Sequence, residues 1–107
     1  MDPKIVESME RLLEVAERDT GQSRKVANFL LGWWNAPVCG GFDLTDLWGL
    51  DAELQRDIVY VIVYIVGHQG HYADRLVSRS RMERLVRDWR PKLFAETGTD
   101  DHRWDFL

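Results

Sequence analysis

The segment from Leu54 to Val66, LQRDIVYVIVYIV, constrains the fold more than any other part of this 107-residue chain. Its β-branched residues favour a strand. Two observations favour a helix instead: no turn separates Ile58 from the helix N-cap residue Asp51, and a single strand would have no partner strand. We therefore expect a helix over residues 52–66. Because this helix is apolar on nearly all sides, we expect it to form the buried centre of the fold.

Helical periodicity predicts two helices before this segment. The first begins at Pro3, with Asp2 as its N-cap, and ends near residues 20–21, where a glycine can close it. The second has Ser23 as its candidate N-cap. It ends at residues 35–37, Asn-Ala-Pro, because proline interrupts a helix.

Shorter elements follow on either side of the central segment. Residues 43–49 predict one short helical turn, and the Gly-His-Gln-Gly sequence at 67–70 ends the central helix. Residues 71–79 are expected to hold another turn or short helix. Ser-Arg-Met-Glu at 80–83 is typical of a capping box that opens a last helix, which Pro91 ends.

Length and composition indicate one all-α domain over residues 1–94, with four to five helices around the central helix. Residues 95–107 are predicted to be a polar tail, with Trp104 and Phe106 as side chains that can dock on the body. The single cysteine, Cys39, excludes an internal disulfide and fits a cytoplasmic protein, and the charged N-terminus is unlike a secretory signal. The central apolar run has nine residues, fewer than the ~20 of a membrane span, so we expect no membrane partner.

The chain carries no motif typical of catalysis or cofactor binding. It lacks GxSxG, HExxH and a glycine-rich phosphate loop, so we expect a protein that is not an enzyme and needs no cofactor. His68, His71 and Cys39 are candidate metal ligands, but a structural zinc site needs four ligands in paired spacings. We therefore expect no metal site, and a solvated turn for the two histidines.

The strongest candidate for a binding surface lies in the C-terminal third. Residues 71–93 carry seven basic and three acidic side chains, although the net charge of the chain is −4. Arginine matches phosphate geometry and stacks on bases, and single-stranded DNA needs both kinds of contact. The alternative is a solvated helix face with ion pairs such as Arg84 with Asp88. The residues expected to bind nucleic acid are Arg75, Arg79, Arg81, Arg84, Arg87 and His71, with Trp34 and Tyr72 as possible aromatic contacts.

Trp34 is also open to a second interpretation. It follows Trp33, and neighbouring residues on a helix point about 100° apart, so one ring can lie in the core and the other at its margin. Packing of both rings inside the core is the commoner use of tryptophan.

The stretch NFLLGWWNAPVCGGFDLTDLWGLDAELQRDI, with ERLLEVAERDTGQSRKVANF before it and RLVRDWRPKL after it, resembles a small all-helical family of proteobacterial plasmids, prophages and integrative elements. The resemblance spans roughly residues 9–93, and WWN followed by GGFDLTDLWGLD is its most specific part. The family has no established enzyme activity to transfer, and the resemblance implies no functional residues. Small acidic proteins of such elements include anti-CRISPR proteins, and this chain resembles the type I-E or I-F inhibitor class.

The resemblance implies a non-enzymatic inhibitor of a type I CRISPR-Cas system in the cytoplasm of a bacterial host. Such an inhibitor can bind single-stranded DNA through the arginines, or bind the effector complex through an acidic surface that imitates phosphates. A regulatory or accessory protein of a mobile element is a further alternative, and the chain can be a monomer or a homodimer. The acidic alternative uses Asp43, Asp46, Asp51, Glu53 and Asp57.

Overall fold

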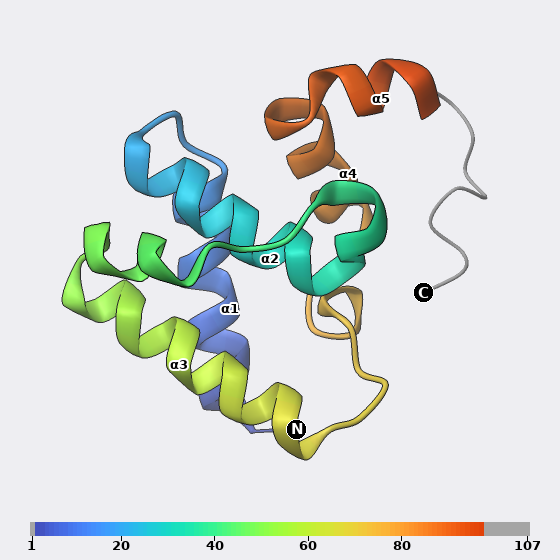
Figure 1. Ribbon diagram of the computed structural model, residues 1–107. Helices are drawn as coiled ribbons and strands as arrows, with labels where there is room; N and C mark the ends of the chain where they lie inside the picture. Colours follow the sequence, from blue (N-terminus) through green and yellow to red (C-terminus); the bar gives the residue numbers. More distant parts are fainter. Residues whose placement is uncertain (1, 98–107) are drawn as a thin grey trace.

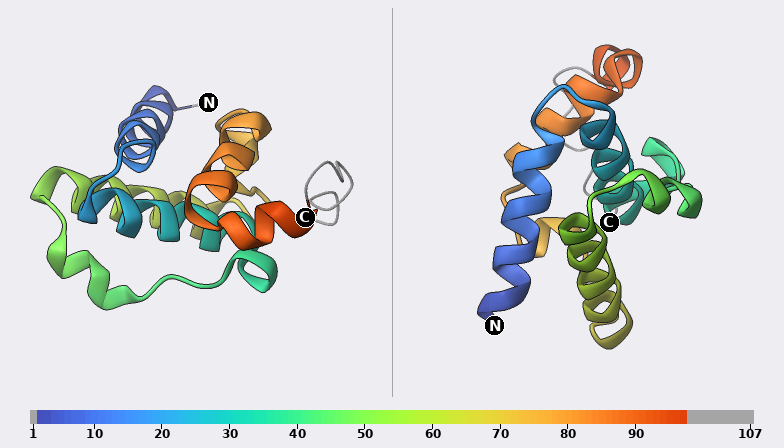
Figure 2. Two further views of the ribbon diagram at one scale, coloured as in Figure 1. Left: turned by 90° about the horizontal axis from the view of Figure 1, so that it is seen from above. Right: turned by 90° about the vertical axis from the view of Figure 1, so that its left-hand side faces the viewer.

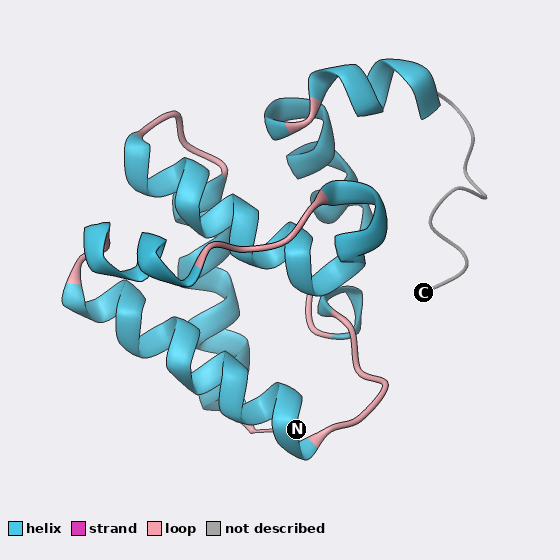
Figure 3. Cartoon of the chain, in the orientation of Figure 1, coloured by secondary structure: helices cyan, strands magenta, loops and turns pink. Residues whose placement is uncertain are grey.

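The computed structural model describes residues 2–97, and that part of the chain is all-α, as predicted (Figures 1 and 3). It contains five α-helices, two short 3₁₀ helices and no strand. The elements in chain order are α1 (Pro3–Ala16), α2 (Gly21–Cys39), η1 (Leu44–Gly49), α3 (Ala52–Gly67), η2 (Ala73–Arg75), α4 (Arg79–Trp89) and α5 (Pro91–Thr97).

Helices α1 and α2 pack against each other and are joined by a short connection. Asp2 caps α1 as predicted, because its carboxylate accepts a hydrogen bond from the Lys4 amide at 2.9 Å. Helix α1 ends at Ala16, before the predicted end at residues 20–21. The reason is that Thr20 serves as the N-cap of α2, accepting from the Ser23 amide at 3.0 Å. Ser23 is therefore inside α2, and the prediction that it caps this helix is wrong.

Helix α2 bends where the sequence predicts that it stops. Asn35 leaves the helical region, with φ −161° and ψ 74°, and the helix resumes as far as Cys39. Pro37 has no N–H to donate to the preceding turn, so a kink at this point is expected. Gly40 then ends the helix with φ +91°, a conformation that glycine adopts without strain. Proline here bends the helix and glycine ends it.

Helix α3 confirms the choice of helix over strand but is not the buried centre of the fold. Of its residues, four are buried: Leu54, Asp57, Ile58 and Val61. Helix α1 packs against this side, whereas α3 itself forms the lower edge of the molecule in Figure 1 and in the right view of Figure 2. The apolar residues on its other side therefore face outward.

Helix α4 begins before the predicted start at Ser80. Its N-cap is Ser78, which accepts from the Arg81 amide at 3.3 Å, so the predicted capping box from Ser80 does not form. Pro91 follows the end of α4, as expected, but it also begins α5, which suits proline because the first helical N–H has no partner. Helix α5 reaches Thr97, past the predicted boundary at residue 94, and Trp104 and Phe106 lie outside the described residues.

The core lies between α1, α2 and α4, with one side of α3 closing it. Trp34 is its largest fully buried side chain. No helix of the described residues is long and apolar enough to cross a membrane. The other fully buried large side chains are Ile5, Met9, Leu12, Leu13, Val26, Leu30, Leu31, Ile58, Val61, Met82 and Leu85.

Candidate interaction surface

Arg81, one of the predicted DNA-binding residues, instead connects α4 to α1. Its guanidinium donates to Glu10 at 2.9 Å and to Glu17 at 2.8 Å, and its side chain is only 22% exposed. The hydrogen bonds to Glu17 and then Glu10 raise the pKa of Arg81 above its ordinary value. This arginine therefore has a structural role that leaves little of its charge for a ligand.

The remaining arginines are divided between paired and exposed positions. Arg79 lies 3.2 Å from Glu83, and Arg87 lies 3.0 Å from Asp88. Arg75 and Arg84 are exposed, and neither has an acidic partner among residues 2–97. The basic surface is consequently less positive than the count of arginines suggests.

The predicted aromatic contacts also differ in their exposure. Trp34 is completely buried, so the prediction that it contributes to a contact surface is wrong, and its ring belongs to the core. Tyr72 is 39% exposed, next to half-buried His71. Of the two predicted aromatic contacts, only Tyr72 is accessible to a ligand.

His71 belongs to a cluster of rings at the C-terminal end of α3. Its Nδ1 lies 2.9 Å from the Tyr64 hydroxyl, and the Trp33 indole donates to its carbonyl at 3.1 Å. His68 stacks on Tyr64, with 4.0 Å between ring centroids. Burial, and then the charges of Arg75 and His68, lower the pKa of His71. His71 is therefore half-buried against Tyr64, whereas His68 is exposed, as expected for a solvated turn, and also stacks on Tyr64.

A hollow of about 550 Å³ lies beside this ring cluster, between the start of α1 and the end of α3. Its lining includes Ile5, Val63 and Tyr60, whose hydroxyl donates to Asp2. That hydrogen bond, followed by the one from the Lys4 amide, lowers the pKa of Asp2. Tyr60 thereby joins α3 to the first residues of α1.

No group of three or more potential metal ligands occurs within the described part of the chain. Cys39 is 3% exposed at the end of α2, and burial raises the pKa of its thiol to about 11. A thiol with this pKa is almost entirely protonated near neutral pH, so it is a weak nucleophile and a poor metal ligand.

The acidic surface predicted as a phosphate mimic is incomplete. Asp57 is 4% exposed and forms two hydrogen bonds with Arg11, at 2.8 and 2.9 Å, on the inner side of α3. Asp43 caps η1 by accepting from the Thr45 amide. Asp51 caps no amide of α3, and its carboxylate accepts from Gln22 at 3.2 Å. Asp46 is half-buried, and Glu53 is the remaining exposed carboxylate of the set.

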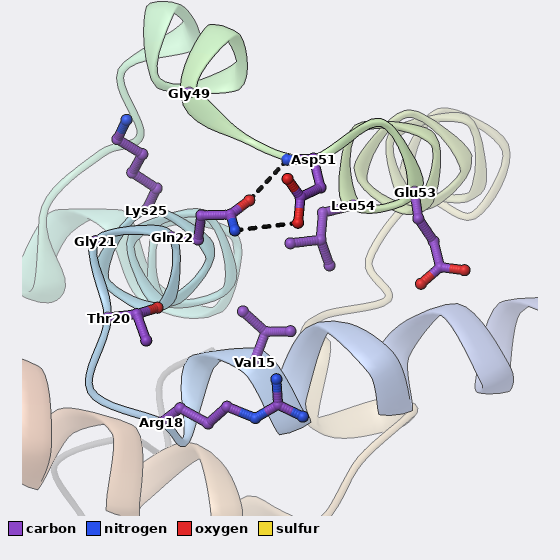
Figure 4. Close-up of a pocket in the computed structure, with 10 residues that line it drawn as sticks. All are labelled: Val15, Arg18, Thr20, Gly21, Gln22, Lys25, Gly49, Asp51, Glu53 and Leu54. Carbon is purple, nitrogen blue, oxygen red and sulfur yellow. Dashed lines mark hydrogen bonds between the residues drawn. The ribbon is translucent and has the colours of Figure 1, made fainter.

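Figure 4 shows a hollow of about 610 Å³ between α1, α2, η1 and α3, which two of these acidic residues, Asp51 and Glu53, border. Arg18 and Lys25 contribute positive charge to its wall, and Asp51 and Glu53 contribute negative charge. The dashed lines in Figure 4 mark the two hydrogen bonds between Gln22 and Asp51 that join α2 to the start of α3. With both signs of charge in its wall, this hollow does not present a uniformly acidic surface.

A row of exposed, mostly apolar side chains on α3 faces away from the core. We call Arg56, Val59, Val63 and Val66 the α3 outer face. Val59 is 53% exposed, Val63 is 63% exposed and Val66 is 82% exposed. Spacings of three and four residues place them on successive turns of one side of the helix.

A hollow lies on the α3 outer face, and η1 lies beside the first turns of α3. A hollow of about 320 Å³ is formed by Gln55, Arg56, Val59, Tyr60 and Val63. On η1, Trp48 is 83% exposed and Leu44 is 68% exposed. The Gln55 side-chain amide donates to the Leu47 carbonyl at 2.7 Å, which fixes η1 beside α3.

Sequence reasoning missed the α3 outer face because it assigned all of α3 to the core. The sequence did contain a signal: Val59, Val63 and Val66 lie on the side of the helix opposite Leu54 and Val61. Helix α3 is thus apolar on two opposite sides, and α1 packs against one of them.

A family model matches residues 6–90. The chain belongs to a family of unknown function, DUF7673. The match runs from the first turns of α1 to the residue after α4 and contains η1 and the whole α3 outer face, whereas α5 follows it. No curated protein matches the DUF7673 chain, and neither does any solved structure.

Proposed function

We propose that this chain is a non-catalytic protein-binding protein that binds its partner through the α3 outer face. The observation that carries the proposal is the exposure of three valines on successive turns of one helix, at 53%, 63% and 82%. Single exposed apolar residues are normal on soluble proteins. A continuous apolar patch is uncommon on a monomer and is typical of a binding surface.

The composition of this surface supports a protein partner. Arg56 is the one charged member of the α3 outer face, and depletion of charge at the centre is typical of protein–protein interfaces. Trp48, fixed beside α3 through η1, adds the residue type most enriched at energetic hot spots. Nucleic acid would need several cations here, and a helix that binds a membrane surface carries rows of lysine and arginine on its polar side.

Our second candidate function is inhibition of a type I CRISPR-Cas system by binding single-stranded DNA. Two exposed arginines, Arg75 and Arg84, favour it, and Tyr72 adds an accessible ring near Arg75. An inhibitor of this kind acts in the bacterial cytoplasm. We rank it second because Arg81 and Arg87 have carboxylate partners within the fold.

The two candidates are separated by photo-cross-linking in the bacterial host. A benzoylphenylalanine residue replaces Val63 in one variant and Arg84 in a second. The protein-binding proposal expects protein adducts from position 63 and fewer from position 84, because Val63 belongs to the α3 outer face and Arg84 lies on α4. Adducts to nucleic acid from position 84, with none to protein from position 63, would overturn it in favour of the second candidate.

The matched control places the same photoreactive residue at Ala95. This residue is exposed on α5, which lies on the opposite side of the molecule from α3 in Figure 1. Equal yields of the same adducts from positions 95 and 63 would mean non-specific contact and would also overturn the proposal.

A further inference from the structure

We infer that the partner of the α3 outer face is a second copy of this chain, whose α3 packs antiparallel against the first about a two-fold axis. This inference rests on the proposed function and names the partner of the same surface. The spacing of the exposed residues, the shape of the hollow beside them and the charges at the two ends of α3 support it.

The spacing of the exposed residues is that of a helix–helix interface. Ala52, Arg56, Val59, Val63 and Val66 are separated by four, three, four and three residues. This is the alternation of a coiled-coil core, in which positions repeat every 3.5 residues on average. The row lies opposite the buried residues of α3, so a second helix can reach it without disturbing the core.

The hollow on this face has the form that receives one side chain of a neighbouring helix. Arg56, Val59, Tyr60 and Val63 stand at i, i+3, i+4 and i+7, and they line the hollow of about 320 Å³ together with Gln55. In knobs-into-holes packing, four residues at this spacing surround one side chain of the facing helix. The occupant is therefore a helix that presents a side chain of suitable size.

Helix α3 of a second copy presents such side chains in a matching register. When two α3 helices run antiparallel with Val63 of one opposite Val59 of the other, Val63 enters the partner's hollow. The two-fold axis makes the same contact twice, as an isologous interface requires. Each copy then supplies both the knob and the hole from the same row.

The charges of α3 favour the antiparallel arrangement. In this register Arg56 of one copy lies beside Val66 of the other, at the C-terminal end of the partner helix. The last turn of α3 contains no basic residue, so its carbonyl groups and the negative end of the helix dipole have no cation from their own helix. A parallel pair would instead place Arg56 next to Arg56, which is unfavourable.

The first test is the mass of the full chain in solution, measured by sedimentation equilibrium over about a hundred-fold range of concentration. We expect a monomer–dimer equilibrium, and we expect Val63→Glu to weaken it by roughly 100-fold or more because the substitution acts twice in a two-fold interface. Ala95→Glu is the matched control: it makes the same change of charge on exposed α5 and leaves the dimer unchanged.

The second test fixes the register with engineered disulfides. Arg56→Cys and Val66→Cys, prepared as separate variants, are each about 15 Å from the equivalent residue of an antiparallel partner, since the helix rises 1.5 Å per residue. Each variant alone therefore stays uncross-linked, and a mixture of the two forms the linked dimer. Cross-linking of Arg56→Cys with itself would overturn the antiparallel register.

The remaining outcomes separate this inference from the proposed function. A wild-type chain that stays monomeric, while position 63 cross-links to a different protein in the host, overturns the second copy and leaves the protein-binding function standing. A dimer that is insensitive to Val63→Glu overturns the inference because it uses another surface. A chain that stays monomeric and yields no protein adduct from position 63 overturns both.

Discussion

Helices α3 and α4 have similar side chains facing the core, but the side chains on their outer sides differ in chemical character. The inner side of each contributes fully buried aliphatic residues to the core, such as Ile58 and Leu85. The outer side of α4 carries arginines, three of which pair with carboxylates, whereas the outer side of α3 carries exposed valines. Helix α4 therefore presents charge to water, whereas α3 presents apolar side chains, which in our proposal a partner covers.

The largest effects are expected where the two helices are alike. Ile58→Ala and Leu85→Ala each remove a fully buried aliphatic side chain and should each lower the free energy of unfolding by about 2–5 kcal/mol. Urea denaturation followed by circular dichroism measures both. A loss well below this range for Ile58→Ala alone would show that α3 is more weakly attached to the core than α4.

A smaller effect on the free energy of unfolding is expected for the ion pairs of α4, and its size should differ between Arg81 and Arg87. Arg81→Gln should cost about 1–2 kcal/mol, because Arg81 is largely covered and bridges two glutamates of α1. Arg87→Gln, in an exposed pair with Asp88, should change stability by less than about 0.5 kcal/mol. Equal losses from the two variants would contradict the structural role assigned to Arg81.

The outer side of α3 should contribute almost nothing to the stability of a single copy. Val63→Ser is expected to change the free energy of unfolding by less than about 0.5 kcal/mol when it is measured at the lowest usable concentration, where a dimer dissociates. At high concentration the same substitution should lower the melting temperature of the assembled protein. A loss of 2 kcal/mol or more in the dilute sample, roughly the cost of a buried valine, would place Val63 in the core.

The smallest expected effect is the change of stability with pH that comes from His71, in the ring cluster at the end of α3. The pKa of His71 is lowered from 6.5, so below that pH an unfolded chain binds the proton more readily than the folded chain does. The contribution of neutral His71 to stability is therefore complete above pH 6.5 and decreases as the pH falls through the lowered value. Titration of the imidazole signals by NMR checks the direction. A midpoint above 6.5 would contradict the described burial of His71.

The helices could be predicted largely from local sequence. The choice of helix for residues 52–66 was correct: Asp51 does hold the N-cap position, although its side chain caps no amide, and the lack of a partner strand outweighed the β-branched composition. The buried residues of α4, Met82, Leu85 and Val86, recur at helical spacing. Exact ends were harder to predict: Ser78 and Ser80 stand two residues apart, and the tertiary packing that selects Ser78 is not visible in a local pattern.

The candidate surface could not be predicted in the same way, because it depends on contacts between distant residues. Arg81 contacts glutamates that lie 71 and 64 positions earlier, and this removes it from the predicted DNA-binding set. A helix that is apolar on all sides can be central, or it can lie at an edge and need a partner. Composition alone does not distinguish these cases, whereas the position of α1 does.

The segment that forms α3 also determines how the chain behaves when it unfolds. From Ile58 to Val66 there are nine uncharged residues, seven of them β-branched, without a proline or glycine. Such a segment has the composition of a steric zipper, so a chain that releases α3 exposes a site for cross-β aggregation. Arg56 and Asp57 stand immediately before the run, where charged gatekeeper residues oppose stacking. The solubility of this protein therefore depends on how rarely α3 leaves the fold.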